Sequence, residues 1–316
     1  MKSMWTLAIA VGGLAVVAVI ALVVRQRSAE PVATGPAEPD PTIGQPVAGA
    51  KVFFLGHSLV GPHLPQLVES FAVARGKACE VHGQLGWGTM LRQHWGWDGA
   101  MDDAAPPGFQ RDNRPPFFLG EAKAQLDTGS YQVLVLTESN GHVRIGVRET
   151  VEHATRFVRR ARTKNPTLRA YVYTGWLDRK EFDSPAAWRE RTRADRAWWE
   201  RVADGINAAI PGPDVGVIPG GAILAAVSEA VEQGRVPGVA RDEELFADSV
   251  HLGQLGLYVI ALAQYAVIFR DDPTGLPDRT RSESGESAPV PSAVAASLQA
   301  LVWEHLRSWP RAAIGH

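Results

Sequence analysis

Short apolar runs alternate with longer amphipathic stretches along most of the chain after Ala50. The short runs are rich in β-branched residues, as buried strands are, whereas apolar residues in the long stretches recur every three or four positions, as on one face of a helix. The predicted strands are 51–55, 78–82, 133–137, 169–174 and 215–218. The predicted helices are 64–75, 147–162, 185–210, 221–232, 252–269 and 293–309. This alternation predicts an α/β fold, a three-layer α/β/α sandwich around a parallel sheet of about five strands.

Two segments interrupt the alternation. Residues 96–117 are rich in proline, glycine, aspartate and tryptophan without a clear period, which indicates a lid or a binding loop rather than a plain connection. Residues 271–291 are polar and are predicted to form a mobile surface loop. The C-terminal helix that follows them is expected to pack on the same domain.

The N-terminal segment differs from the rest of the chain. Residues 4–24 carry no charge and are long enough to cross a bilayer as a helix. Cleaved signal peptides have a shorter apolar region and a small-x-small cleavage site, so the sequence favours an uncleaved transmembrane anchor over 1–27. Residues 28–49, rich in proline, alanine and glycine, have the composition of a linker to a domain over 50–316. We therefore expect a membrane-anchored domain on the extracytoplasmic side, in the periplasm or at the cell surface, although the flanking charges do not decide the orientation.

Composition and charge exclude several classes of protein. A net charge of −2 gives no electrostatic basis for binding nucleic acid. The single cysteine, Cys79, rules out a disulfide within the chain and is expected to pack in a strand as a small apolar residue. The common metal and nucleotide motifs are absent, so neither a metal nor another cofactor is predicted. The ten tryptophans are compatible with core packing or with sugar-binding surfaces.

The candidate chemistry begins with a serine at the end of the first predicted strand. An apolar run and Gly56 precede Ser58, and open parallel sheets bind their ligands beyond the carboxyl ends of the strands. Much later in the chain, Asp248 stands three residues before His251, a spacing that places a carboxylate beside an imidazole and predicts a base for the serine proton. The alternatives are that Ser58 caps the following helix and that Asp248 caps the helix near residue 252.

Two further segments follow predicted strands and offer hydrogen-bond donors. The glycine-rich stretch 83–89 lets a backbone N–H approach a developing oxyanion, and the amide of Asn140 lies just after strand 133–137. A flexible turn in the first case and an Asn-Gly turn in the second are the simpler explanations.

In their order along the chain, these four blocks resemble the SGNH (GDSL-like) hydrolase family, whose sandwich has a flavodoxin-like sheet. The resemblance implies Ser58 as the nucleophile, His251 as the base and Asp248 as the carboxylate that orients the base. It also implies an oxyanion hole formed by the Ser58 N–H, the Gly86 N–H and the Asn140 side chain.

The resemblance covers most of residues 50–270, with two departures. His57 gives a Gly-His-Ser-Leu block where the family has Gly-Asp-Ser-Leu or Gly-Asn-Ser-Leu. The usual Gly-x-Asn-Asp block reads Glu-Ser-Asn-Gly, so Glu138 or His142 is an alternative to the asparagine in that part of the site. Gly88 is likewise an alternative to the preceding glycine of its block.

The resemblance implies a serine esterase that acts on an O-acyl ester, with O-acetyl as the favoured acyl group, and the tryptophans suggest a carbohydrate substrate. Substrate contacts are expected from His57, Trp87, Glu138, His142 and Trp176. Two alternatives stay open. One is an O-acyltransferase that passes the acyl group to a cell-envelope polysaccharide, and the other is a non-catalytic binding module on the same fold.

Overall fold

The computed structural model describes residues 45–96, 118–119, 121–139, 145–282 and 284–312. The predicted anchor over 1–27, most of the linker, nearly all of the predicted lid over 96–117, Asn140 and His142 lie outside these residues. Among the described helices, none combines the length and the apolar character needed to span a bilayer.

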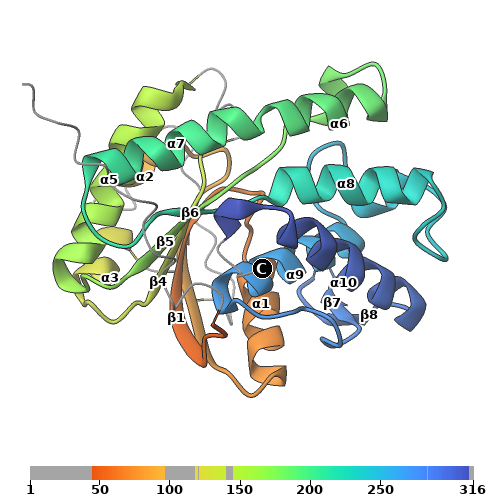
Figure 1. Cartoon of the computed structure of the whole chain (residues 1–316), viewed down its shortest axis with the longest axis horizontal. Helices are drawn as coiled ribbons and strands as arrows, with labels where there is room; N and C mark the ends of the chain where they lie inside the picture. Colours follow the sequence, from red (N-terminus) through yellow and green to blue (C-terminus); the bar gives the residue numbers. More distant parts are fainter. Residues whose placement is uncertain (1–44, 97–117, 120, 140–144, 283, 313–316) are drawn as a thin grey trace, which may run out of the picture. The chain divides into compact units, whose positions relative to one another are not determined.

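The centre of the fold is a parallel sheet whose strands lie in the order β3-β2-β1-β4-β5-β6 (Figure 1). The strands are β1 Gly49–Gly56, β2 Ala78–Leu85, β3 Phe118–Leu119, β4 Val133–Leu136, β5 Arg169–Tyr173 and β6 Gly216–Ile218. Without the two-residue β3, the order is β2-β1-β4-β5-β6. When these five strands are renumbered along the chain, this becomes 2-1-3-4-5, which is the flavodoxin-like order. The prediction of an α/β fold around about five parallel strands is confirmed.

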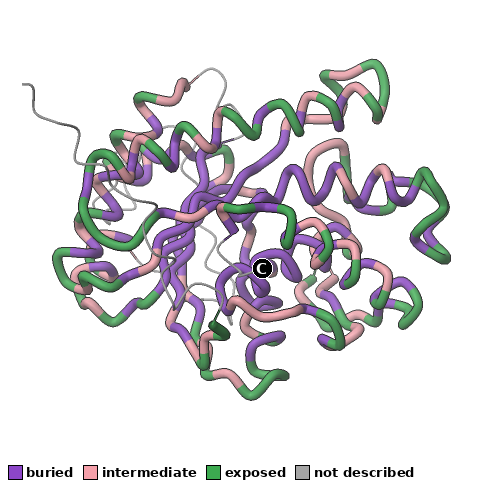
Figure 2. The backbone as a smooth tube through the Cα atoms, viewed as in Figure 1, coloured by how far each residue is buried: buried purple, intermediate pink, exposed green. Residues whose placement is uncertain are grey.

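Helices cover both faces of the sheet. The helices are α1 His63–Ala74, α2 Leu91–Gly96, α3 Ala122–Asp127, α5 Val147–Lys164, α6 Pro185–Ala194, α7 Arg196–Ala209, α8 Gly220–Glu232, α9 Gln254–Phe269 and α10 Ser292–Arg307. The buried strands run between the two helical layers (Figure 2). Along β1, Val52 and Phe54 face the layer of α1, α8, α9 and α10, and Phe53 and Leu55 face that of α3, α5 and α7. Both faces are therefore apolar, which explains the continuous hydrophobic run.

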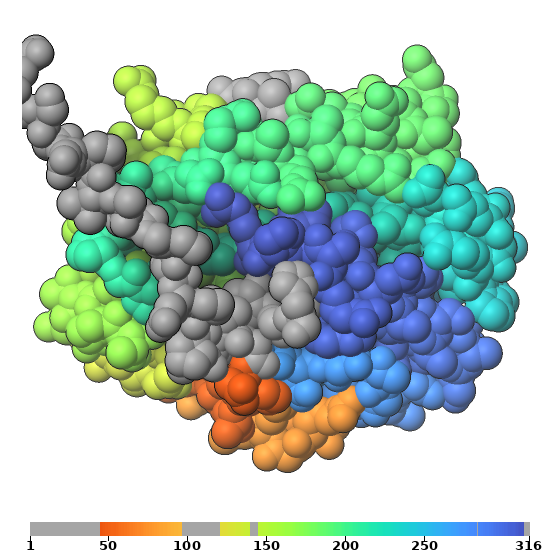
Figure 3. Space-filling model, viewed as in Figure 1, coloured from red at the N-terminus to blue at the C-terminus, as the bar shows by residue number. Residues whose placement is uncertain are grey.

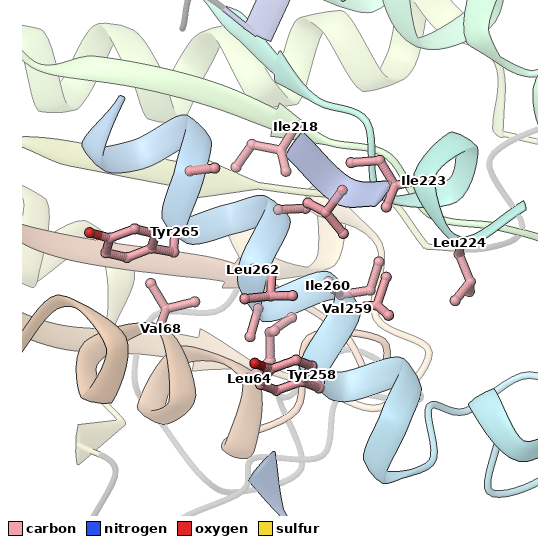
Figure 4. Close-up of a cluster of buried hydrophobic side chains, with 14 of the residues drawn as sticks. Leu64, Val68, Ile218, Ile223, Leu224, Tyr258, Val259, Ile260, Leu262 and Tyr265 are labelled. Carbon is pink, nitrogen blue, oxygen red and sulfur yellow. The ribbon is translucent and has the colours of Figure 1, made fainter. Parts of the chain in front are cut away.

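The larger core surrounds α9, which is buried on nearly all sides. Tyr258, Leu262 and Tyr265 of this helix pack among side chains of α1, such as Leu64 and Val68 (Figure 4). Figure 3 shows α10 on the outside of this layer, where it packs on α8 and α9. The C-terminal helix therefore packs on the same helical layer as α8 and α9.

Two predicted elements are wrong in detail. The single helix over 185–210 is interrupted at Asp195, because α6 packs against α8 on one side of the sheet and α7 packs against α5 on the other. The predicted loop over 271–291 contains a hairpin of β7 Arg279–Arg281 and β8 Ser287–Pro289. The hairpin is anchored by Thr280, which is buried and donates a hydrogen bond to the Gln254 carbonyl at 2.9 Å.

Candidate active site

Ser58 lies just beyond the carboxyl end of β1, in the turn that leads to α1. The turn closes tightly, because the Val60 and Gly61 N–H groups both donate to the His57 carbonyl. A Cβ atom on Gly56 would lie 2.7 Å from Val60 Cγ2 and 2.9 Å from Thr137 Cγ2, so only glycine fits before this turn. The helix α1 starts at His63, so Ser58 does not cap it.

Asp248 and His251 lie in a short loop between a 3-10 helix, η2 Asp242–Leu245, and α9. A bridge between Phe246 and Leu252 closes the loop, and the Ala247 N–H donates to the His251 carbonyl at 2.9 Å. The helix α9 starts at Gln254, so Asp248 does not cap it. The closed loop instead presents the side chains of Asp248 and His251 at the carboxyl edge of the sheet.

A continuous hydrogen-bonded chain joins the three side chains. His251 Nε2 lies 3.0 Å from Ser58 Oγ, and His251 Nδ1 lies 2.7 Å from Asp248 Oδ2. Because the carboxylate can only accept, it requires the proton on Nδ1 and leaves Nε2 as the acceptor for the serine hydroxyl. The structure therefore brings Ser58, Asp248 and His251 into the arrangement that their sequence pattern predicted.

The Asp248 carboxylate is held in its ionised form. Partial burial alone would raise its pKa, but hydrogen bonds from the His251 backbone, the His251 ring and the Val250 backbone lower the pKa of Asp248 to about 2. One oxygen, Oδ1, accepts both backbone N–H groups, so Oδ2 is left for the imidazole. The carboxylate thus shapes the loop with one oxygen and orients His251 with the other.

A pocket of about 940 Å3 opens beside Ser58 and His251. Its lining includes Trp87, apolar side chains at the start of α9 and the hairpin residues Arg281 and Ser282. The hairpin that sequence reasoning missed thus forms part of the pocket wall. Its three-residue strands are too short and too polar to show a strand pattern.

The predicted oxyanion hole needs one correction. The Gly86 N–H donates to the Gly56 carbonyl at 3.1 Å, extending the pairing of β2 with β1, so it does not point at a substrate. Gly88, the alternative to Gly86, is exposed and has a φ of 63°. The Ser58 N–H makes no hydrogen bond to any other described residue. Asn140 lies outside the described residues and stays a prediction.

Of the five residues predicted to contact substrate, Trp87 lines the pocket. His57, Glu138 and Trp176 are instead buried, and their polar atoms bond within the protein. The Trp176 indole donates to the Val250 carbonyl at 2.8 Å, which ties the end of β5 to the Asp248–His251 loop. His142 lies outside the described residues. A position near a strand tip therefore does not by itself place a side chain in the pocket.

Glu138 stabilises the ends of several elements rather than a ligand. Its Oε1 atom accepts hydrogen bonds from the Leu91 and Ser139 N–H groups, and Oε2 accepts from the Thr150 hydroxyl. Burial raises the pKa of Glu138, although these hydrogen bonds act in the opposite direction. The side chain joins β4 to α2 and α5. Within the part of the chain that the structure describes, no group of three acidic, histidine or cysteine side chains is arranged to hold a metal ion.

Sequence reasoning also missed His94, a fully buried residue of α2 whose ring reaches the Gly56 carbonyl. Its signal in the sequence is weak. His94 follows Leu91 at a helical spacing of three residues, which is equally compatible with an ordinary core position.

No protein-family model matches the sequence, and no curated protein matches it. Several solved structures do match this chain. A DUF4886 family protein from Bacteroides uniformis has a TM-score of 0.53 at 13% identity, over 83% of this chain and 96% of that one. A GDSL-like lipase from Parabacteroides merdae has a TM-score of 0.43 at 11% identity, over 72% and 97%. A carbohydrate esterase of family 3 from Talaromyces cellulolyticus has a TM-score of 0.39 at 14% identity, over 69% and 95%.

The fold of the DUF4886 protein, across nearly the whole length of that protein, is shared by this chain. The structural neighbours at low identity also include a lipase/acylhydrolase from Enterococcus faecalis and a family 3 carbohydrate esterase from Clostridium thermocellum.

Proposed function

We propose that this protein is an SGNH-type serine esterase that hydrolyses an O-acyl ester. One observation carries the proposal. Asp248, His251 and Ser58 form an unbroken chain of hydrogen bonds at the carboxyl edge of the sheet, and the last two residues border a pocket of about 940 Å3. This is the arrangement that activates a serine for acyl transfer.

The reaction follows from the positions of the protons. Ser58 Oγ attacks the ester carbonyl carbon while its proton passes to His251 Nε2, and Asp248 stabilises the imidazolium that results. The carbonyl oxygen becomes an oxyanion, for which the Ser58 N–H is an available donor. When the ester C–O bond breaks, His251 returns the proton to the leaving alcohol. Water then attacks the acyl-serine with the same help from His251, which releases the acid and restores the Ser58 hydroxyl.

The acyl group and the alcohol are a finer part of the proposal. An acetyl group fills only a small part of the pocket, so we assign most of that volume to the alcohol part of the substrate. Trp87 offers a partly exposed aromatic surface there, and Ser282 and Ser284 offer hydroxyl groups. Aromatic surfaces with nearby hydroxyl groups suit a sugar ring, so we propose an O-acetylated carbohydrate as the substrate.

Ester hydrolysis by the isolated domain tests the proposal. Residues 45–316 should release 4-nitrophenol from 4-nitrophenyl acetate, and Ser58→Ala should abolish the release by roughly a million-fold loss of kcat. Ser297→Ala is the matched control, because Ser297 is a serine of α10 that donates to the Ala293 carbonyl and does not line the pocket. Failure of the wild-type domain to hydrolyse any short ester, while correctly folded, would favour a binding module. Adding a sugar acceptor to the same assay separates hydrolysis from acyl transfer.

We also propose that residues 4–24 anchor the domain on the extracytoplasmic side of a membrane. The support is the uncharged, 21-residue apolar run and the linker composition that follows it. The full chain should sediment with membranes and be released by detergent, and deletion of residues 1–28 should yield a soluble, active protein. A mature chain that begins after the apolar run would show a cleaved signal peptide instead.

A further inference from the structure

Two fully buried histidines hydrogen-bond to backbone groups near Ser58. His57 directly precedes the serine, and His94 comes from α2. Both side chains are 0% exposed, so neither ring contacts the pocket. Buried imidazoles are costly to keep unless their nitrogens are paired, so the hydrogen bonds of each ring indicate what it does.

His57 bonds to both sides of the nucleophile turn. Its Nε2 atom lies 2.9 Å from the Glu138 carbonyl, which can only accept, so Nε2 carries the proton. Its Nδ1 atom then accepts from the Leu59 N–H at 3.4 Å. An acceptor that reaches the backbone two residues ahead is the function of the side chain in an Asx turn. His57 therefore holds the residue after Ser58 and anchors the turn to the end of β4.

His94 holds the residue before His57. Its Nε2 atom donates to the Gly56 carbonyl at 3.0 Å, the same oxygen that accepts the Gly86 N–H. The tautomer is fixed through Gln84. The Gln84 Oε1 atom accepts from the Ala122 N–H at 2.7 Å, so its amide nitrogen must face His94 Nδ1, at 3.0 Å, as a donor. His94 Nδ1 is thus the acceptor and Nε2 the donor.

We propose that His57 and His94 are positioning residues, whose neutral imidazoles clamp the backbone on both sides of Ser58. With Gly56 and Leu59 held in this way, the Ser58 Oγ atom stays 3.0 Å from His251 Nε2 and the Ser58 N–H stays unpaired within the described residues. Because Leu59 N–H is already bonded to His57, the N–H of Ser58 is left as the donor of this turn for an oxyanion. This inference rests on the proposed function.

The clamp requires both rings to be neutral. A second proton on either ring would turn its Nδ1 atom from an acceptor into a donor. The His57 Nδ1–H would then face the Leu59 N–H, and the His94 Nδ1–H would face the Gln84 amide nitrogen, so both hydrogen bonds would be lost. Burial, together with the nearby His57, lowers the pKa of His94 to about 3, against the raising effect of its hydrogen bond to Gly56. The neutral form is therefore the one present at neutral pH.

Nitrogen-15 NMR of the histidine rings tests the clamp without any substrate. At pH 7 the spectrum should contain two neutral rings protonated on Nε2, one of which should be missing in His57→Asn and the other in His94→Gln. The His94 ring should stay neutral down to about pH 5. Protonation of either ring on Nδ1 at pH 7, or conversion of the His94 ring to an imidazolium above pH 5, would overturn the hydrogen-bond assignment on which the proposal depends.

Matched substitutions test the effect on the nucleophile. Glutamine at 94 keeps a donor near the position of Nε2, and asparagine at 57 keeps an acceptor near the position of Nδ1, whereas leucine keeps neither. We expect His94→Leu and His57→Leu to lower kcat for 4-nitrophenyl acetate by roughly 10- to 100-fold with KM within about threefold, as a small misplacement of a reacting atom does. His94→Gln and His57→Asn should stay within about fivefold of wild type. His82→Gln is the control, because His82 is a partly buried histidine of β2 whose ring contacts Tyr131 and Glu80.

Rates are compared per folded molecule, using the circular dichroism spectrum and the melting temperature to verify folding. A loss that appears in the leucine variants and is restored in the glutamine and asparagine variants supports a positioning role. Full kcat in a folded leucine variant, or equal losses in leucine and conservative variants, would overturn it. If wild-type protein neither hydrolyses esters nor reacts with a fluorophosphonate, the proposed function is wrong and the positioning role falls with it, whatever the NMR tautomers show.

Discussion

The Nε2 atom of His251 lies 3.0 Å from the Oγ atom of Ser58, although the two residues are 193 positions apart in the chain. Ser58 is placed by the end of β1, and His251 by a loop that the Phe246–Leu252 bridge closes before α9. Each segment is shaped by its own local hydrogen bonds. Their meeting depends on α9 packing against α1 in the larger core.

Asp248→Asn tests the orientation of His251. The new Oδ1 can still accept the Val250 and His251 N–H groups, so the loop should keep its shape. The Nδ2 amide would then face His251 Nδ1 as a donor, which forces the proton onto Nε2 and removes the base. We expect kcat to fall by roughly a thousand- to ten-thousand-fold with little change in melting temperature. Asp178→Asn, which alters a helix cap at η1 Arg179–Glu181, is the control and should be silent in kcat. An active Asp248→Asn enzyme would remove Asp248 from the triad.

Asn140→Ala tests the oxyanion hole implied by the family resemblance. If the amide stabilises the oxyanion, kcat should fall by roughly a hundred- to a thousand-fold while KM changes little, because the bond forms mainly in the transition state. His142→Ala should have a mild effect. The opposite pattern, with Asn140→Ala nearly silent and His142→Ala severe, would show that Asn140 is not the oxyanion donor implied by the family resemblance.

Trp87→Ala tests the pocket. Trp87 borders the same cavity as Ser58, so its loss should weaken binding of a bulky alcohol but leave the reaction at the carbonyl intact. We expect KM for an O-acetylated oligosaccharide to rise by about tenfold, with kcat for 4-nitrophenyl acetate within about twofold. Trp188→Phe, in the core on α6, is not expected to change the ratio of the two substrates. Equal losses on both substrates would argue that Trp87 supports the fold rather than the sugar.

Acid stability should depend on His94. Its pKa is lowered to about 3 in the folded protein, so below its ordinary value of 6.5 the unfolded chain binds a proton that the folded chain does not. The free energy of unfolding therefore falls as the pH falls from about 6.5 toward 3. Between pH 7 and pH 4.5, His94 alone should lower the free energy of unfolding by about 2 kcal/mol. Urea unfolding of His94→Gln should show that much less loss of stability over the same pH range. Identical pH dependence in wild type and variant would contradict the buried, neutral ring.

The parallel sheet can be predicted from sequence because its strands are buried on both faces and form continuous apolar runs such as Val133–Leu136. The same local pattern cannot show that the two halves of 185–210 pack on opposite sides of the sheet, since helical periodicity alone does not identify the partner. The β7–β8 hairpin is too short and polar to stand out. Its place in the pocket wall is set by tertiary contacts such as Thr280 with Gln254.

The meeting of Ser58, Asp248 and His251 can be predicted because the serine follows a strand and the other two residues are three positions apart. The direction in which a side chain or an N–H group points is harder to predict than its position near the site. Trp176 is close to the Asp248–His251 loop, but its indole donates to the Val250 carbonyl and its ring is buried. The Gly86 N–H is used by the sheet, which depends on the register of β2 against β1 and is invisible in a glycine-rich motif.

Covalent labelling with a fluorophosphonate tests the central claim most directly, since it needs a nucleophilic serine and no knowledge of the substrate. Mass spectrometry of the digested protein should place one phosphonyl group on Ser58, with labelling absent in Ser58→Ala and strongly slowed in His251→Gln. Folded wild-type protein that stays unlabelled, or that carries the label on a different residue, would contradict the assignment of Ser58 as an activated nucleophile.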